Sequence, residues 1–179
     1  MRSTGQSIAQ KVQLRFSKTG ALRFLSHHDV MRLFERACRR AGLPVRLTQG
    51  FAPHPRLVFA TALELGIESQ AEVLEIEMSR WMPPAQIRSR LGAQLPAEVA
   101  ILEARLLPPT RSGERVVRMV FKVSLPGAIA SRLGPDRLAA LLERSELPFD
   151  RHRQKRVQHL DLRPSLLALK LEGTELTVV

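Results

Sequence analysis

Two short segments of this 179-residue chain carry histidines that could bind phosphate or act in acid–base catalysis. In the first, His27 and His28 precede Asp29, and Ser26 completes the pattern of a capping box, which predicts a helix starting near residues 27–30. Free backbone N–H groups and the helix dipole favour an anion such as phosphate at a helix start. Alternatively, Asp29 is only a first-turn acid and both histidines are solvated or capping groups.

The second segment is residues 49–56, where His54 stands between Pro53 and Pro55. The prolines hold it outside regular structure, and imidazole titrates near neutral pH. His54 could therefore stack on a base, contact a phosphate or act as a general acid or base, or it could simply fill a turn. Phe51 could offer a stacking surface or anchor the loop in the core, and anchoring is the interpretation we favour.

Standard cofactor and catalytic motifs are absent from the sequence. There is no GxGxxG, P-loop or nucleophile elbow, and the single cysteine, Cys38, excludes a disulfide or a multi-cysteine metal site. Joining His27 or His28 to Asp29 and His54 matches no metal-ligand spacing. We therefore expect no cofactor, no metal and no catalysis by the chain alone. If the protein is a nuclease, the candidate catalytic residues are His54, His28 and His27.

A basic helix separates the two histidine segments. An apolar stripe at helical spacing predicts it, formed by Val30, Leu33, Phe34, Ala37, Cys38 and Ala41. The opposite face carries Arg32, Arg36, Arg39 and Arg40, with Glu35 spaced to pair with Arg39. Gly42 and Pro44 are expected to end the helix.

The net charge of +11 is concentrated near the N-terminus. Residues 1–60 hold eleven Lys and Arg against two acids, a net +9, whereas residues 61–110 carry −3 and the remainder +5. Arginine outnumbers lysine, and guanidinium groups suit phosphate and base edges. This distribution is typical of a nucleic-acid binder, although a GC-rich genome would also favour arginine. No apolar run could cross a bilayer and residues 1–10 do not resemble a signal peptide, so we expect a cytoplasmic protein without membrane contact.

These observations together predict an RNA-binding surface. Its residues are Arg15, Arg23, His27, His28, Arg32, Arg36, Arg39, Arg40, Gln49, Phe51, His54 and Arg56. A second basic cluster is either a solvated edge or a further phosphate contact; its members are Arg151, His152, Arg153, Lys155 and Arg156. The acids between residues 64 and 77 alternate as a solvent-facing side of a strand would.

The periodicity predicts an α+β protein of two packed ferredoxin-like (βαββαβ) units. Residues 1–10 are expected to be a disordered lead-in, and the first unit is expected to occupy 11–109. Its strands are predicted at 11–17, 43–49, 71–79 and 99–109, with a possible strand start at 56–63. A second helix is predicted at 82–96. A polar turn at 110–114 marks the boundary. The second unit, 114–179, is expected to be an incomplete, variant or cut copy of the first. Its expected elements are a strand at 115–125, a helix at 135–145 and a basic extended segment at 149–163. Residues 166–179 are expected to form a final strand pair, or a short helix plus a strand.

Residues 11–125 resemble the radical-SAM-associated domain of unknown function. The resemblance rests on RFLSHHDVMRLFERACRRAGLP, QGFAPHP and LGIES followed by Glu72, although His28 stands where leucine is usual and Ala52 where asparagine is common. Members are fused behind, or encoded beside, radical SAM proteins, often near genes for ribosomal proteins and an RNase of the E/G type. The resemblance implies an accessory module for a radical SAM partner. The chain lacks CxxxCxxC and cannot itself hold that partner's iron–sulfur cluster.

Three functions are consistent with the sequence. The first is an accessory protein that binds tRNA or rRNA and presents it to a partner modification enzyme. The second is a metal-independent endoribonuclease resembling the tandem ferredoxin-like enzymes that process CRISPR transcripts. The third is a protein-docking module whose basic face meets an acidic partner.

Overall fold

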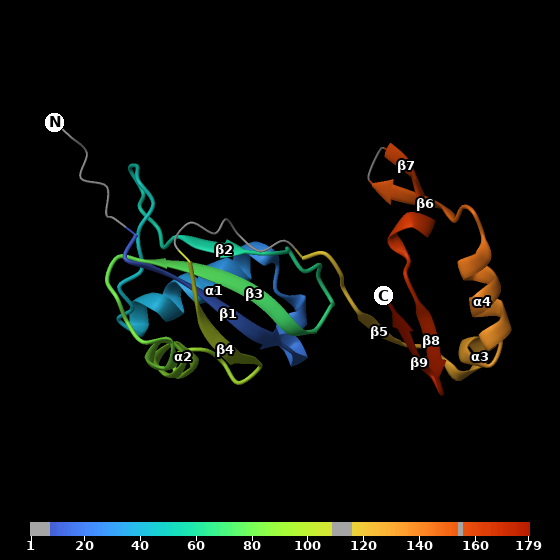
Figure 1. Cartoon of the computed structure of the whole chain (residues 1–179), viewed down its shortest axis with the longest axis horizontal. Coiled ribbons are helices and arrows are strands. Elements are labelled where there is room, and N and C mark those ends of the chain that lie inside the picture. The colour runs from blue at the N-terminus through green and yellow to red at the C-terminus, as the bar shows by residue number, and fades with distance from the viewer. Residues whose placement is uncertain (1–7, 109–115, 154–155) are drawn as a thin grey trace. The chain divides into compact units, whose positions relative to one another are not determined.

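The computed structural model describes residues 8–108, 116–153 and 156–179, and the chain forms two compact units (Figure 1). Unit 1 ends at Val116 and unit 2 begins at Val117. Both combine helices with antiparallel sheets, which confirms the α+β class. The expected turn at 110–114 and most of the expected disordered lead-in lie outside the described residues.

Unit 1 has the expected order of strand, helix, strand, strand, helix, strand. Its elements are β1 (Gln10–Lys18), the short 3-10 helix η1 (Gly20–Phe24), α1 (His27–Arg40), β2 (Leu57–Phe59), β3 (Ser69–Met78), α2 (Pro84–Gly92) and β4 (Val99–Leu107). The strands form one sheet in the order β2-β3-β1-β4, and every neighbouring pair is antiparallel. The two central strands are therefore the ones that precede the two helices.

The second strand of this sheet is not the one that alternation at 43–49 predicted. Val45 and Leu47 form only isolated bridges, to Met78 and Pro55, and β2 begins at Leu57 instead. Proline has no N–H to donate to a ladder, so a segment bounded by Pro44 and Pro55 cannot continue as a regular strand.

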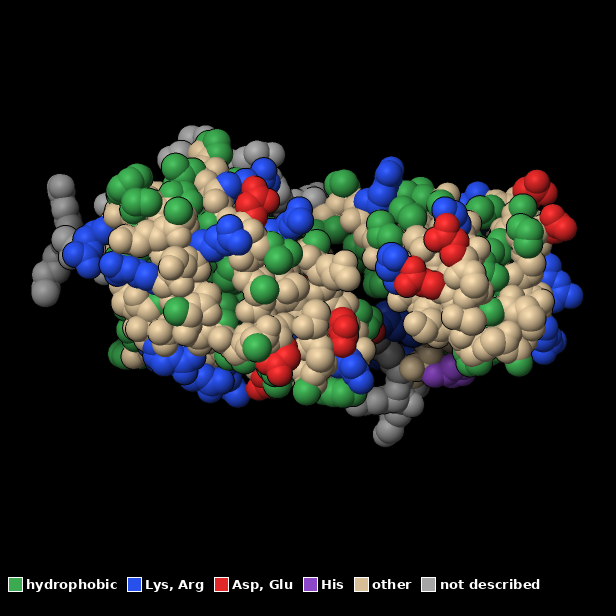
Figure 2. Space-filling model, turned by 90° about the horizontal axis from the view of Figure 1, so that it is seen from below, with side chains coloured by type: hydrophobic (Ala, Val, Ile, Leu, Met, Phe, Trp, Pro, Cys, Tyr) green, Lys and Arg blue, Asp and Glu red, His purple; other side chains and the backbone are tan. Residues whose placement is uncertain are grey.

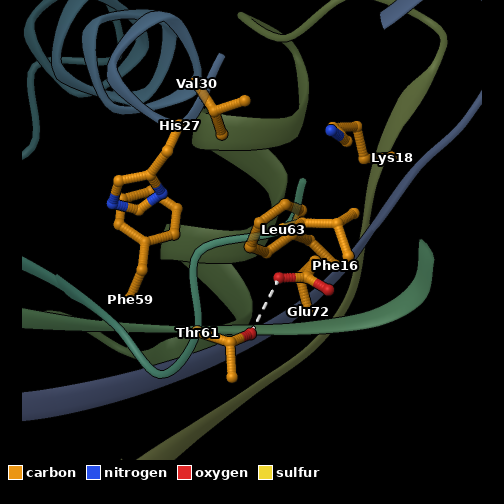
Figure 3. Close-up of a pocket in the computed structure, with 8 residues that line it drawn as sticks. All are labelled: Phe16, Lys18, His27, Val30, Phe59, Thr61, Leu63 and Glu72. Atoms are coloured by element: carbon orange, nitrogen blue, oxygen red, sulfur yellow. Dashed lines mark hydrogen bonds between the residues drawn. The ribbon is translucent and has the colours of Figure 1, made fainter. Parts of the chain in front are cut away.

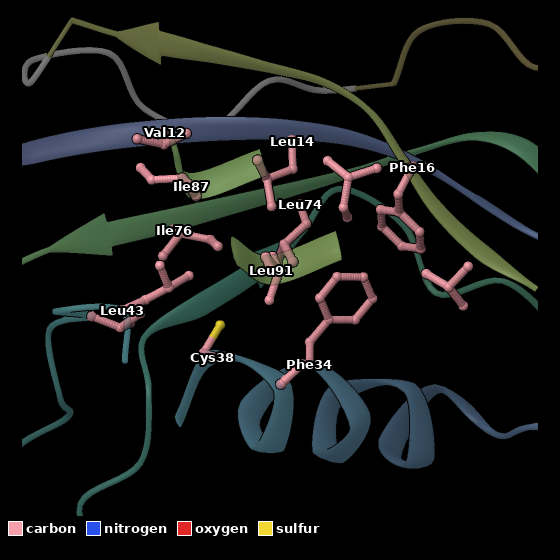
Figure 4. Packing of buried hydrophobic residues seen from close by; sticks show 14 of the residues in the cluster. Val12, Leu14, Phe16, Phe34, Cys38, Leu43, Leu74, Ile76, Ile87 and Leu91 are labelled. Atoms are coloured by element: carbon pink, nitrogen blue, oxygen red, sulfur yellow. The ribbon is translucent and has the colours of Figure 1, made fainter. Parts of the chain in front are cut away.

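The core of unit 1 lies between the sheet and the two helices (Figure 4). Alternation in β1 turns Val12, Leu14 and Phe16 toward the helices, and the same face of β3 supplies Leu74, Ile76 and Met78. The helices complete the cluster with Val30, Phe34, Ala37 and Cys38 from α1 and with Ile87 and Leu91 from α2. This packing fixes which face of α1 is left for solvent.

Local signals set the ends of α1. The Ser26 hydroxyl accepts a hydrogen bond from the Asp29 backbone N–H at 3.2 Å, as an N-cap does. At the other end Gly42 has a φ of 62°, a left-handed conformation that glycine adopts without steric cost. The predicted start and end of this helix are therefore confirmed.

Unit 2 does not repeat the βαββαβ order. It contains β5 (Phe121–Ser124), α3 (Gly127–Ala130), α4 (Pro135–Glu143), β6 (Pro148–Arg153), β7 (Arg156–Asp161), the 3-10 turn η2 (Arg163–Ser165), β8 (Leu169–Glu172) and β9 (Glu175–Val178). These strands form a three-stranded sheet, β5-β9-β8, and a separate β6-β7 hairpin. The second ferredoxin-like unit is thus not confirmed, because the basic segment at 149–163 pairs with itself.

Candidate nucleic-acid interface

The outer face of α1 presents four exposed arginines, which we call the arginine face: Arg32, Arg36, Arg39 and Arg40. Arg32 lies 4.0 Å from the Asp29 carboxylate, and Arg40 donates a hydrogen bond to the Gln94 carbonyl at 2.6 Å. No ion pair joins Arg39 to Glu35 in the described part of the chain, so the expected i,i+4 pair is absent. The arginine face therefore keeps most of its charge available to an anionic partner.

Residues 46–56, here called the 46–56 hairpin, project from unit 1 ahead of β2 as the turquoise loop in Figure 1. The Thr48 N–H donates to the His54 carbonyl at 2.8 Å, and the Arg56 N–H donates to the Arg46 carbonyl at 2.8 Å. The Thr48 hydroxyl accepts from the His54 N–H at 3.1 Å and lies 3.2 Å from its Nδ1. Backbone and side-chain contacts thus hold His54 in one exposed position.

The base of the 46–56 hairpin is fixed by one carboxylate on β3. Glu77 Oε2 lies 2.8 Å from Arg46 Nη1 and 3.1 Å from Arg56 Nε, and its Oε1 lies 3.9 Å from Lys11 Nζ. The expected solvent-facing acid is therefore mostly covered by three cations. Glu75 on the same strand is also buried, which corrects the simple solvent-face interpretation.

Phe51 lies at the tip of the 46–56 hairpin with its side chain fully exposed. The favoured expectation that it anchors the loop in the core is wrong. Gly50 beside it has a φ of 129°, which turns the chain at the tip, and Pro55 rather than Phe51 is the buried residue of the segment. An exposed ring on a fixed hairpin can stack on a planar group.

A pocket lies at the N-terminal end of α1 (Figure 3). We call it the α1 pocket, and its lining residues are Phe16, Lys18, His27, Val30, Phe59, Thr61, Leu63 and Glu72. The His27 ring meets the Phe59 ring edge-on, with centroids 5.3 Å apart. Lys18 is only 2% exposed, and burial lowers the pKa of its ammonium, an effect that the nearby Glu72 carboxylate partly offsets.

The predicted RNA-binding residues lie along α1, in the 46–56 hairpin or, in the case of Arg15 and Arg23, outside both. His27, His28 and Arg32 lie at the start of α1, whereas the 46–56 hairpin stands at the other end of β3, where Val45 pairs with Met78. From Glu72, beside the α1 pocket, to Glu77, at the hairpin base, β3 rises by about 17 Å. His54 is therefore not brought together with His27 or His28 in one acid–base site.

Two predicted residues, Arg15 and Arg23, lie outside both α1 and the 46–56 hairpin. Arg15 is exposed on the sheet face opposite the helices, whereas Gln49 is part of the hairpin and is exposed there. Arg23 pairs with Glu68 at 3.1 Å and covers the Phe24 ring. Figure 2 shows Lys and Arg side chains in several separate groups on one face, with acidic side chains between them.

The second basic cluster occupies the β6-β7 hairpin of unit 2. His152 and Arg156 are exposed there and Arg151 is partly exposed, while Lys155 and the Arg153 side chain lie outside the described part of the chain. His159 Nδ1 lies 2.6 Å from the Asp150 carboxylate on the neighbouring strand. The structure thus confirms an exposed strand edge and leaves a phosphate contact as a prediction.

Sequence reasoning missed Lys18 and Glu72, although the signal was present. Alternation through Phe16 places Lys18 on the inward face of β1, and alternation back from Leu74 places Glu72 on the inward face of β3. Phe16 and Glu72 are cross-strand partners, so both charged residues extend the core face beyond its apolar part. The predicted strand ended at residue 17, one residue before Lys18, so the inward position of Lys18 was not recognised.

Fold and surface together define an α+β protein with a basic helix face and a projecting aromatic hairpin on unit 1. A family model matches residues 11–179, and the chain accordingly belongs to DUF2344, described as an uncharacterized protein conserved in bacteria. No curated protein matches the chain. Across the described ranges, no helix is long and apolar enough to span a membrane, and no three His, Cys, Asp or Glu side chains gather as metal ligands.

Proposed function

We propose that this protein binds RNA, tRNA or rRNA, through the arginine face and the 46–56 hairpin, and presents it to a partner modification enzyme. The observation that carries the proposal is Phe51, a fully exposed aromatic ring at the tip of the 46–56 hairpin. The base of this hairpin is fixed by the Glu77 carboxylate, which forms ion pairs with Arg46 and Arg56. Aromatic side chains on rigid supports stack on unpaired bases of single-stranded segments.

Charge supports the same surface. Arg36 and Arg39 have no ion pair within the described residues, and the first sixty residues carry a net +9. Arginines that project from one side of a helix can neutralise successive phosphates and release their counterions. Binding of this kind weakens steeply with salt.

The partner is inferred from the resemblance of residues 11–125 to the radical-SAM-associated domain. We propose a radical SAM enzyme as the partner, a cytoplasmic location, and a ferredoxin-like fold for unit 1, whose strand order β2-β3-β1-β4 fits that arrangement. The single cysteine is buried, and burial raises its pKa to about 12, so the partner must supply any iron–sulfur ligands.

Docking to a protein is the second candidate, and unit 2 supports it. Val117, Val120 and Leu167 expose 93%, 60% and 56% of their surface, and all four residues of β5 are exposed. Exposed apolar side chains in this number are typical of a surface that a partner protein covers. The two functions are compatible if unit 1 holds RNA while unit 2 holds the enzyme.

The test is binding of labelled total tRNA and rRNA fragments across a salt series without metal. We expect intact RNA to bind with a steep salt dependence. Phe51→Ala should weaken binding by about 1–3 kcal/mol at every salt concentration, because it removes stacking rather than charge. Trp81→Ala, another exposed aromatic of unit 1, is the matched control and should bind normally.

Two outcomes would replace this proposal. Discrete cleavage of the RNA that is lost in His54→Ala would favour the endoribonuclease. Absence of binding at low salt would leave protein docking as the function.

A further inference from the structure

The α1 pocket holds a buried lysine, Lys18, whose nearest charged neighbour in the pocket lining is the Glu72 carboxylate. Lys18 is 2% exposed, and no hydrogen bond or ion pair joins its side chain to another within the described residues. Figure 3 shows its ammonium end directed toward the space between β1, α1 and the segment after β2. Because this ammonium makes no hydrogen bond to a described side chain, it can donate one to a ligand atom that enters the pocket.

The opposite wall of the α1 pocket supplies an acceptor. Glu72 stands across from Phe16 in the β1-β3 ladder, and the Thr61 hydroxyl donates to its Oε2 at 3.4 Å. A ligand between Lys18 and Glu72 therefore meets a donor on one side and a carboxylate on the other. That pairing disfavours a bare anion and favours a group that both accepts and donates.

The size of the α1 pocket limits which chemical group can enter it. The space that can hold the centre of a water-sized molecule is about 10 Å³, which is room for about one water molecule. A nucleobase or a whole phosphate does not fit, whereas a single hydroxyl group does. Phe59 and Leu63 are the partly exposed apolar residues of the lining, and they can pack against the carbon skeleton that carries the hydroxyl.

We propose that the α1 pocket binds a ribose 2′-hydroxyl of the RNA, which accepts from Lys18 and donates to Glu72. The proposal rests on the RNA-binding function argued above and names how the protein distinguishes RNA from DNA. Exposed His28 and Arg32 lie on the same end of α1, as do the first free N–H groups of the helix, so the adjoining phosphate has partners there.

The test compares three single-stranded oligonucleotides of one sequence: RNA, its 2′-deoxy form and its 2′-O-methyl form. We expect RNA to bind roughly tenfold to a hundredfold more tightly than the other two, the range for a hydrogen bond to a charged group. The 2′-O-methyl form keeps the sugar pucker of RNA but has lost the donor and is larger, so it separates the hydroxyl from helix geometry. Equal binding of all three overturns this inference while leaving RNA binding intact, and binding of none overturns both.

Variants then locate the discrimination. Lys18→Met should lower the affinity for RNA to the affinity for the 2′-deoxy oligonucleotide, and it should leave the affinity for the 2′-deoxy oligonucleotide unchanged. Glu72→Gln should partly reduce the preference for RNA over the 2′-deoxy form. Thr61→Val keeps both charged groups and tests the support of Glu72, in case Lys18→Met unfolds. Lys170→Met on β8, an exposed lysine of unit 2, removes the same charge and should preserve the preference. A preference that survives Lys18→Met in folded protein would refute the assignment.

Discussion

Units 1 and 2 differ in how much apolar side chain they bury. Sixteen buried residues form one continuous cluster in unit 1, whereas the buried hydrophobic residues of unit 2 in the described part of the chain are Ala130 and Leu138. In unit 2 the three-stranded sheet and the β6-β7 hairpin are separate, so no single sheet face collects a core. Burial is the main favourable term in folding, so unit 1 should be much the more stable.

The contrast has a functional consequence. A hairpin whose tip must stay exposed needs a rigid base, and the sheet of unit 1 provides one through Glu77. Unit 2 instead leaves apolar side chains exposed, as a surface that a partner protein covers does. Under the proposed function, unit 1 would be the part that contacts nucleic acid and unit 2 the part that contacts the partner protein.

The largest expected effect comes from emptying the core of unit 1. Phe34 is fully buried and its ring centroid lies 4.7 Å from that of Phe16, so Phe34→Ala should cost about 3–5 kcal/mol. Leu138→Ala in unit 2 should cost about 2 kcal/mol, the lower end for such a change, because Leu138 and Ala130 are the only buried hydrophobic residues in the described part of that unit. Hydrogen exchange resolved by peptide in the full chain measures both.

The pattern of protection decides whether the comparison holds. Phe34→Ala should lower protection in β1 and α1, and Leu138→Ala should lower it only in α4 and β8. Equal loss in both units after either change would show that they unfold together, contrary to the contrast drawn above.

Cys38 offers a chemical measure of the same difference. Burial, with a smaller contribution from Glu35, raises the pKa of its thiol to about 12 from a usual 9.0. Between about pH 7 and pH 9 the folded chain should therefore hold roughly a thousandfold less thiolate than the unfolded one. Alkylation should proceed through opening of unit 1, so Phe34→Ala should accelerate it and Leu138→Ala should not. Fast alkylation of the wild-type protein would contradict the burial.

Elements of unit 1 were predictable where one local rule dominated. The alternation of Val12, Leu14 and Phe16 predicted β1, and Ser26 and Gly42 predicted the ends of α1, each within a residue or two. Glu77 was not predictable in its role, because its partners Arg46 and Lys11 are distant in sequence and meet only through strand pairing.

Unit 2 was less predictable for a related reason. A strand was expected over 115–125, but β5 covers only Phe121–Ser124, and the residues described before it form no regular element. An apolar run predicts burial without specifying which surface covers it. Where that surface belongs to another molecule, the sequence of one chain carries no signal for it.

A smaller effect is expected when positive charge is removed from unit 1 or from unit 2 and the salt dependence of RNA binding is compared. Arg36→Gln combined with Arg39→Gln should lower the salt slope of RNA binding by about 0.7 for each phosphate that the protein no longer neutralises, with little change in stability. Arg132→Gln combined with Arg144→Gln removes the same charge from exposed positions of unit 2 and should leave the slope nearly unchanged. Similar slopes for both double variants would mean that RNA binds by net charge alone.

The smallest effect concerns the start of α1. The Ser26 hydroxyl accepts from the Asp29 N–H and donates to the Asp29 carboxylate at 2.6 Å, and that second bond is the main reason the pKa of Asp29 lies below its usual value. Loss of this N-cap in Ser26→Ala should cost about 1 kcal/mol of unit 1 stability at neutral pH.

The pH dependence of Ser26→Ala tests the cause. A carboxyl whose pKa is lowered by folding stabilises the native state above its unfolded pKa, and this stabilisation disappears as pH falls through the folded pKa. The difference between wild type and Ser26→Ala in denaturant unfolding of unit 1 should therefore shrink in acid, leaving the part due to the backbone cap. Asp29→Asn should remove the pH-dependent part and keep the cap. Unit 2 contains neither group, so its unfolding should be identical in all three proteins, and a shift there would show that the units are coupled.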